Sequence, residues 1–115
     1  MRAEALKGHL DALLLAVLEP GPAHGFAVMG ELRRRTGGTV DLESGTLYPA
    51  LRRLEEAGLI TGTWTTGPGR RRREYQLTER GRRALNEERG VWRDFVATIG
   101  AALAAPSATA QDAKA

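Results

Sequence analysis

SGTLYPALRRLEEAGLI, residues 44–60, has the pattern of a helix with a buried face, yet it opens with a tyrosine and a proline. Its small and aliphatic residues recur at helical spacing and predict a buried stripe made of Leu47, Ala50, Leu51, Leu54 and Ala57. At about 100° per residue, Tyr48 and Arg52 lie on the opposite side, with Arg53 on the flank. Pro49 either occupies the first turn, where its missing N–H is spare, or bends the start of the helix.

Two more helices are expected before this segment. Aliphatic residues at helical spacing predict a short helix over residues 10–18. A second helix is expected over residues 23–36, with Phe26, Met29 and Leu32 on one side. After this come two glycines, which stop a helix readily. The chain therefore begins with three consecutive helices.

The period of the sequence changes after Gly58, where the third helix is expected to end. Residues 59–66 are rich in β-branched side chains, Gly67-Pro68-Gly69 is a turn signal, and residues 70–77 can return as a partner strand. Thr78 is a plausible N-cap for a long final helix. Three helices followed by a hairpin predict a winged helix-turn-helix, which is mainly α with a small β-hairpin.

Positive charge is concentrated in the predicted hairpin and just after it. Residues 70–83 hold seven arginines and two glutamates, a local net charge of +5, whereas the whole 115-residue chain carries +3. Such a segment favours a polyanionic partner. Strand alternation places Arg71 and Arg73 on one face and Arg70 and Arg72 on the other. One pair can contact phosphates; the simpler alternative is a solvated surface.

The third helix is the candidate recognition helix, because helices of this class contact base edges chiefly with their N-terminal residues. Ser44, Thr46 and Tyr48 would then lie at the groove, where their hydroxyls can meet phosphate or bases. Arg52 can reach phosphate or guanine, and Arg53 is a further candidate. Ser44 can also be a helix cap, and Tyr48 can pack its ring beneath the hairpin.

The final helix carries more apolar surface than a small domain can cover. Its apolar stripe consists of Leu85, Trp92, Phe95, Val96, Ile99 and Leu103. A monomer would leave this stripe in water, so the pattern predicts a homodimer, with Trp92 packed between the two copies. Trp64 is expected to pack on the hairpin.

The sequence offers little for catalysis, metal binding or membrane insertion. It has no cysteine, no serine–histidine–acid arrangement and no glycine-rich phosphate loop, so no enzyme and no cofactor are expected. His9 and His24 lack paired carboxylates and make a poor metal site; a structural hydrogen bond is expected for His24. The apolar run at residues 10–18 contains Asp11 and is too short for a membrane span. A cytoplasmic protein is expected.

Three pieces of the chain resemble the PadR family of transcriptional regulators: LDALLLAVLEPGPAHGF, SGTLYPALRRLEEAGLI and REYQLTERGRRAL. The resemblance spans about residues 6 to 90 and fits the compact subgroup with one short C-terminal helix. Phe26 departs from it, since the family usually has tyrosine after His-Gly. The resemblance implies a dimeric winged-helix repressor that binds a palindromic operator in double-stranded DNA.

Carried onto this sequence, the resemblance assigns DNA contact to Ser44, Thr46, Tyr48, Arg52 and the hairpin Arg70–Arg73. It assigns the dimer interface to the apolar residues from Leu85 to Ile99. In some compact relatives aromatic residues of the last helix line a pocket for planar ligands, which makes Trp92 and Phe95 candidates for binding a small-molecule effector.

The expected organisation is a winged domain over residues 1–78, a dimerisation helix over residues 79–103 and a disordered tail over residues 104–115. A different function is open to the same fold. Winged helices also serve as protein-interaction modules, and the basic face of such a module would bind an acidic partner instead of DNA.

Overall fold

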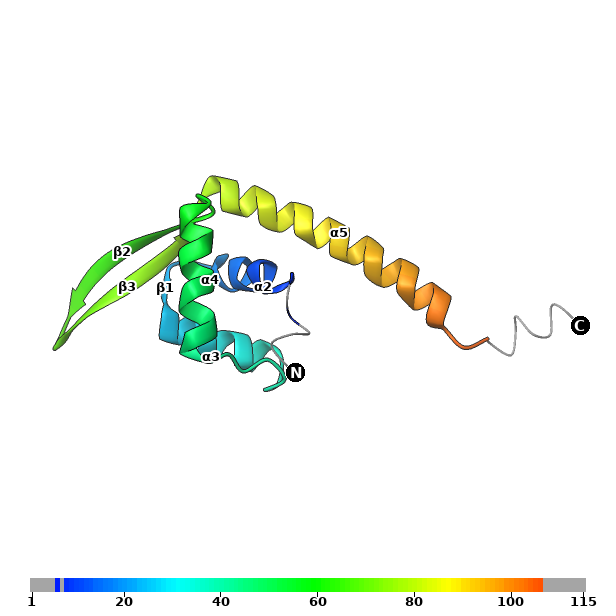
Figure 1. Ribbon diagram of the computed structural model, residues 1–115, viewed down its shortest axis with the longest axis horizontal. Coiled ribbons are helices and arrows are strands. Elements are labelled where there is room, and N and C mark those ends of the chain that lie inside the picture. The colour runs from blue at the N-terminus through cyan, green and yellow to red at the C-terminus, as the bar shows by residue number, and fades with distance from the viewer. Residues whose placement is uncertain (1–5, 7, 107–115) are drawn as a thin grey trace, which may run out of the picture.

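The structure is a computed structural model of the chain, and it describes residue 6 and residues 8–106. The elements are α2 (Leu10–Leu18), β1 (Ala23–His24), α3 (Gly25–Arg35), α4 (Ser44–Glu56), β2 (Ile60–Gly67), β3 (Arg70–Leu77) and α5 (Glu79–Leu103). Figure 1 shows three helices gathered into one domain, the hairpin of β2 and β3 extending to one side, and α5 leaving as a long rod. The winged helix-turn-helix expected from the order of the elements is confirmed.

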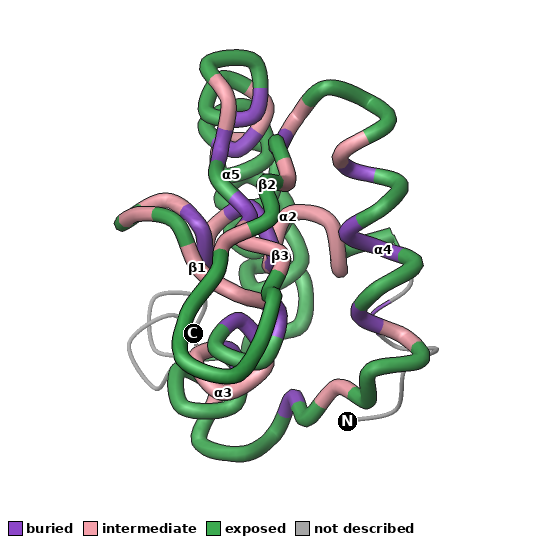
Figure 2. Tube along the Cα trace, turned by 90° about the vertical axis from the view of Figure 1, so that its left-hand side faces the viewer, coloured by how far each residue is buried: buried purple, intermediate pink, exposed green. Residues whose placement is uncertain are grey.

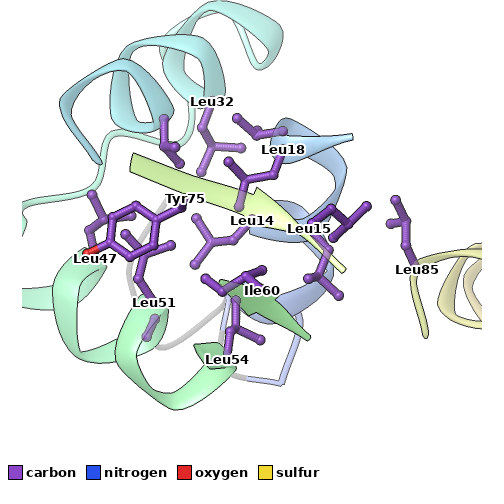
Figure 3. Packing of buried hydrophobic residues seen from close by; sticks show 14 of the residues in the cluster. Leu14, Leu15, Leu18, Leu32, Leu47, Leu51, Leu54, Ile60, Tyr75 and Leu85 are labelled. Carbon is purple, nitrogen blue, oxygen red and sulfur yellow. The ribbon is translucent and has the colours of Figure 1, made fainter. Parts of the chain in front are cut away.

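Leucines from the three packed helices form the core (Figure 3). Leu14 and Leu18 of α2 meet Leu47, Leu51 and Leu54 of α4, and each of these side chains is fully buried. Burying one such side chain stabilises the fold by about 1.5 to 3 kcal/mol. The tube in Figure 2 shows buried residues recurring along α4 between exposed ones, and a hairpin that is exposed at its tip and buried only near its base.

The predicted stripe of α4 is right except at its end. Ala57 is exposed, because α4 stops at Glu56 and Ala57 is only its C-cap. Gly58 follows with φ +76°, a conformation that suits glycine, and the N–H of Leu59 donates to the carbonyl of Leu54 at 3.0 Å. Gly58 thus ends the helix as the sequence indicates, and the chain turns directly into β2.

The sheet has three antiparallel strands in the order β1-β3-β2. The hairpin register runs from Ile60 opposite Leu77 to Gly67 opposite Arg70, with Pro68 and Gly69 as the turn. Ala23 and His24, which the sequence pattern placed in the second helix, instead pair with Tyr75 and Glu74. A two-residue strand has no periodicity to detect, so the helix was predicted two residues too long at this end.

The buried face of α3 also differs from the prediction. Its buried residues are Gly25, Val28 and Leu32, whereas Phe26 is 81% exposed. Phe26 follows Gly25 by one residue and therefore points about 100° away from the face that Gly25 and Leu32 share. Met29, at the margin of that face, packs against the core as expected. Phe26 is left on the surface beside the hairpin.

The first two turns of α5 belong to the domain. Leu85, predicted to lie in a dimer interface, is 1% exposed and is part of the core, so it is not available to a second copy. Arg89 then joins α5 to α2 by donating to both carboxylate oxygens of Glu19, at 2.7 and 2.9 Å. These hydrogen bonds lower the pKa of Glu19. The C-terminal part of α5 extends away from the domain (Figure 1).

The start of α5 is capped as the sequence indicates. The hydroxyl of Thr78 accepts a hydrogen bond from the N–H of Gly81 at 3.0 Å and donates to the carbonyl of Gly58 at 2.7 Å. One side chain thereby joins the end of α4 to the start of α5. Replacing Thr78 with alanine is expected to lower the free energy of unfolding by about 1 to 2 kcal/mol. Chemical denaturation measures it, and Thr78→Ser, which keeps the oxygen, is the control that should lose much less.

Among the described helices, none is long and apolar enough to cross a membrane. Residues 104–106 follow α5 without regular structure, and the remainder of the predicted tail, residues 107–115, lies outside the described part of the chain.

Candidate nucleic-acid interface

The N-terminal half of α4 presents polar side chains to solvent. Glu43 is the N-cap residue, and its carbonyl oxygen accepts from the N–H groups of Thr46 and Leu47, both at 3.0 Å. The alternative in which Ser44 caps the helix is therefore wrong. Ser44 is the first helical residue and is exposed, and Thr46 is half-buried. The hydroxyl of Ser44 is in a position to meet a ligand that approaches this end of α4.

Tyr48 both packs and faces solvent. Its side chain is 42% exposed, yet the ring lies directly against the first residue of α3. A Cβ atom at Gly25 would stand 2.7 Å from Cε1 and from the hydroxyl oxygen of Tyr48, which is closer than real contacts allow. Gly25 is thus required for the position of the ring. The two alternatives for Tyr48, packing and contact, are compatible in this geometry.

Arg73 crosses the sheet to reach α4. Its guanidinium pairs with the carboxylate of Glu55, and both side chains are partly buried. The side chain passes over Gly62, where a Cβ atom would stand 2.7 Å from Nε of Arg73. A glycine at this point of β2 therefore leaves the space that the arginine occupies. The ion pair ties the wing, residues 60–77, to the middle of α4.

Trp64 of β2 shares this face of the sheet. The guanidinium carbon of Arg71 lies 4.6 Å from the centre of its ring, and that of Arg73 lies 5.3 Å away. Guanidinium groups stack well on aromatic faces. Trp64 remains 54% exposed, so it packs on the hairpin, as expected, without entering the core. Arg70 and Arg72 alternate with this pair along β3 and are exposed.

A cleft of about 510 Å³ separates the wing from the helices. Its walls bring together side chains from α3, α4 and the hairpin. Phe26, Tyr48, Trp64, Arg71 and Tyr75 are among the residues that line it. Tyr75 forms the buried floor, and burial raises the pKa of its hydroxyl. The cleft therefore has apolar walls and a cationic edge.

His24 lies at the inner end of the cleft and has a structural contact. Its Nδ1 donates to the carbonyl oxygen of Arg73 at 3.4 Å, and its Nε2 lies 4.0 Å from Glu74. The predicted structural hydrogen bond of His24 is confirmed. Within the described residues there is no group of three or more histidine, cysteine or acidic side chains that could hold a metal ion.

Several other arginines are paired inside the domain. Arg53, a predicted DNA contact, donates to Asp11 of α2 at 2.6 Å and so points to a different neighbour from Arg52. Arg34 and Arg35 both donate to Glu31, which lowers the pKa of that carboxyl to about 2. Arg52 is the exception on α4: its side chain is exposed and its ion pair with Glu56 is long, at 3.4 Å.

The distal half of α5 carries an uncovered apolar face. Its large side chains, between 40% and 79% exposed, are Val91, Trp92, Phe95, Val96, Ile99 and Leu103. Trp92 stacks on Phe95, with ring centres 5.3 Å apart and planes 15° apart, and it also meets His9 at 5.0 Å. A hollow of about 430 Å³ continues from Trp92 between α5 and α2, lined by Leu13, Ala16 and Leu85 among others.

Sequence reasoning found the polar face of α4 and the arginines of the wing, but it missed the residues that place them. Gly25, Gly62 and Glu55 act through close approach or pairing with residues distant in the sequence. A glycine within a strand pattern is a known sign of close backbone approach, so Gly62 carried a usable signal. Glu55, on an ordinary charged helix face, carried none.

The three helices, the hairpin with its basic edge and the exposed side of α4 define a winged-helix protein of the kind that regulates transcription. The family model described as "Transcriptional regulator PadR-like family" matches residues 14–87. The chain belongs to the PadR-like family of transcriptional regulators. This confirms the resemblance seen in the sequence.

Three similar proteins give the range of the family relationship. The crystal structure of a PadR family regulator from Eggerthella lenta is 34% identical, with a TM-score of 0.77 over 87% of this chain and 86% of that one. The transcriptional regulator Rv3488 of Mycobacterium tuberculosis is 42% identical over 57% of this chain and 59% of its own length. Bacillus subtilis PadR, crystallised with operator DNA, is 25% identical with a TM-score of 0.63, over 69% of this chain and 45% of that one.

Proposed function

We propose that this protein binds double-stranded DNA in the cytoplasm as a homodimer and represses transcription from a palindromic operator. The observation that carries the proposal is the common cleft between wing and helices. Tyr48 of α4 and the arginines of the wing line it together, so one strand of a duplex can meet both. The structure of Bacillus subtilis PadR with operator DNA supports the same assignment.

On this proposal α4 enters the major groove with its N-terminal residues first. Ser44, Thr46 and Tyr48 meet bases or phosphates at that end, and Arg52 reaches the groove from the next turn. Arg70, Arg71 and Arg72 of the wing meet the phosphates that flank the groove. Arg53 and Arg73 are left out, because each is paired with an acid of its own domain.

The apolar face of α5 supports the homodimer. Six large side chains from Val91 to Leu103 are exposed on a single helix. Monomeric proteins rarely leave a continuous apolar surface of this kind in water. A two-fold pair of α5 helices through Trp92, Phe95, Val96 and Ile99 would cover it. Such a dimer requires a two-fold operator, with half-sites about 10 base pairs apart or a multiple of that.

A small aromatic or hydrophobic effector is proposed to relieve repression. Trp92 and Phe95 stack at the mouth of the apolar hollow between α5 and α2, which suits a planar ligand. Binding there would change the angle between the two α5 helices and favour a state with lower affinity for DNA. Quenching of tryptophan fluorescence by candidate compounds tests this step. Unchanged quenching in Trp92→Ala would show that Trp92 does not contribute to the effector site.

DNA binding is tested by fluorescence anisotropy with the duplex upstream of the protein's own gene, at two salt concentrations. Tight binding to an inverted repeat that weakens steeply with salt is expected, because phosphate contacts release counterions. Absence of binding at low salt would contradict the proposal and favour a protein-interaction module.

Replacing Arg52 with alanine is expected to weaken operator binding about tenfold, or about 1.4 kcal/mol. The side chain is exposed and its ion pair with Glu56 is long, so the thermal stability should change little. Tyr48→Phe, which removes one hydroxyl, should weaken binding in the same direction. Arg83→Ala is the matched control: Arg83 is an exposed arginine of α5, with an ion pair of 3.9 Å to Glu79. Equal losses in Arg52→Ala and Arg83→Ala would argue against a recognition role for α4.

A further inference from the structure

The four consecutive arginines of the wing have different surroundings. Arg73 is partly buried and ion-paired, Arg71 is exposed and stacked on an aromatic ring, and Arg70 and Arg72 lie on the other face of β3. The four identical residues therefore have at least two kinds of surroundings. The two kinds should contribute differently to the binding of a polyanion.

The contacts of Arg73 hold the wing against α4. Its charge is already balanced by Glu55, its carbonyl oxygen accepts from His24, and its side chain fills the space over Gly62. Moving this guanidinium to a phosphate would leave the carboxylate of Glu55 without its partner in a partly buried position. That exchange costs about what it gains, since one charge-assisted contact is broken for each one formed.

Arg71 has no such competing partner. Within residue 6 and residues 8–106 no acidic side chain forms an ion pair with it, and its guanidinium lies 4.6 Å from the centre of the Trp64 ring. Tyr48 of α4 lines the same cleft as these two residues. A long side chain normally loses rotamer freedom when it binds, and stacking removes much of that freedom before the ligand arrives. Trp64 therefore places a free positive charge at the edge of the cleft.

We propose that Trp64 is a positioning residue that holds Arg71 ready to contact a phosphate, while Arg73 braces the wing against α4 and does not contact DNA. This division of roles rests on the proposed function. The ring of Trp64, more than half exposed, also offers an apolar surface to the deoxyribose next to that phosphate. The wing then contacts the backbone through a tryptophan–arginine unit and not through four equivalent charges.

The dependence of operator affinity on salt separates these roles, because its slope counts the phosphates that the protein neutralises. Because the homodimer carries two copies of each arginine, Arg71→Met should reduce the slope by about two, and Arg73→Met should leave it unchanged. Trp64→Ala removes no charge but should weaken binding about three- to tenfold for each subunit of the dimer, the cost of ordering one long side chain at each half-site. Trp64→Phe keeps an aromatic face and should restore most of the loss.

A double-mutant cycle shows whether Trp64 acts through Arg71. In the Trp64→Ala background, Arg71→Met should cost at least about threefold less than in the wild-type protein. Thr63→Ala, an exposed position of β2 one residue away, is the control and should bind normally. Additive losses from Trp64→Ala and Arg71→Met, or equal slopes in the two arginine variants, would overturn the assignment.

One measurement does not need DNA. In the free protein the side-chain protons of Arg71 should be shifted upfield in the NMR spectrum by the ring current of Trp64, and Trp64→Ala should abolish the shift. Absence of the shift would refute the stacking even if the operator is bound. If the upfield shift is present but no DNA is bound, the proposed function is refuted, and with it the phosphate contact. The stacking of Arg71 on Trp64 would still stand.

Discussion

Replacing Gly81 with alanine is expected to lower the free energy of unfolding by about 3 kcal/mol or more, because the added methyl group has no room. A Cβ atom at Gly81 would stand 2.0 Å from the carbonyl oxygen of Leu59 and 2.9 Å from Cδ1 of Leu77. Leu77 can rotate away, but the carbonyl of Leu59 is backbone and is already bonded to the N–H of Thr78. Overpacking against a fixed group usually costs about 1 to 3 kcal/mol, and sometimes more.

The same helix provides a matched control. Gly90 has no atom within 4 Å of the position of an added Cβ. There the higher helix propensity of alanine should stabilise the protein by up to about 1 kcal/mol. The two substitutions are chemically identical, but the surroundings of the added methyl group differ. They should therefore change the midpoint of chemical denaturation in opposite directions. Equal stability of Gly81→Ala and the wild-type protein would mean that the start of α5 is not packed against Leu59 in this way.

Replacing Phe95 with aspartate is expected to separate the dimer and to reduce operator affinity by about a hundredfold or more. Phe95 is about half exposed in the single chain, so the domain itself should lose little stability. In the dimer an aspartate at this position would be buried without a partner, which is strongly unfavourable. Without the dimer each half-site is bound independently, and the gain from linking two binding modules, about a hundredfold to ten thousandfold, is lost.

Sedimentation velocity and anisotropy on the same samples measure both parts of this result. Ala97→Asp is the control: it adds the same charge to α5 at an exposed position on the other side of the helix. It should stay dimeric and bind the operator normally. A Phe95→Asp protein that remains dimeric would show that the apolar face of α5 has another purpose.

The parts of the fold that the sequence predicted are those with local causes. The stripe from Leu47 to Leu54 follows from helical periodicity, and the turn at Pro68 and Gly69 follows from residues that favour turns. The cap at Thr78 needs only its own oxygen and the N–H of Gly81. Each of these features is determined within a few residues, so reading along the chain is enough.

The parts that were missed depend on contacts between distant residues. Leu85 fits the apolar stripe of α5 as well as Trp92 does, and only the packing of α5 on the domain separates the core residue from the exposed ones. In the sequence Arg73 looks like its three arginine neighbours. Only the fold brings it to Glu55 of α4, 18 residues earlier in the chain. The sequence indicates a basic wing, but it does not show which of its charges are already paired.

The double contact between Arg89 and Glu19 has a mechanical consequence. Since α5 rises about 1.5 Å per residue, its 25 residues form a helix about 37 Å long. This contact and the buried side chain of Leu85 attach the helix to the domain. The winged domain and α5 then move as one body. A tilt of α5 by about 5° about its distal end would therefore displace the domain by about 3 Å. Glu19→Gln would weaken the outer of these two attachments and leave Leu85 to hold α5 on the domain.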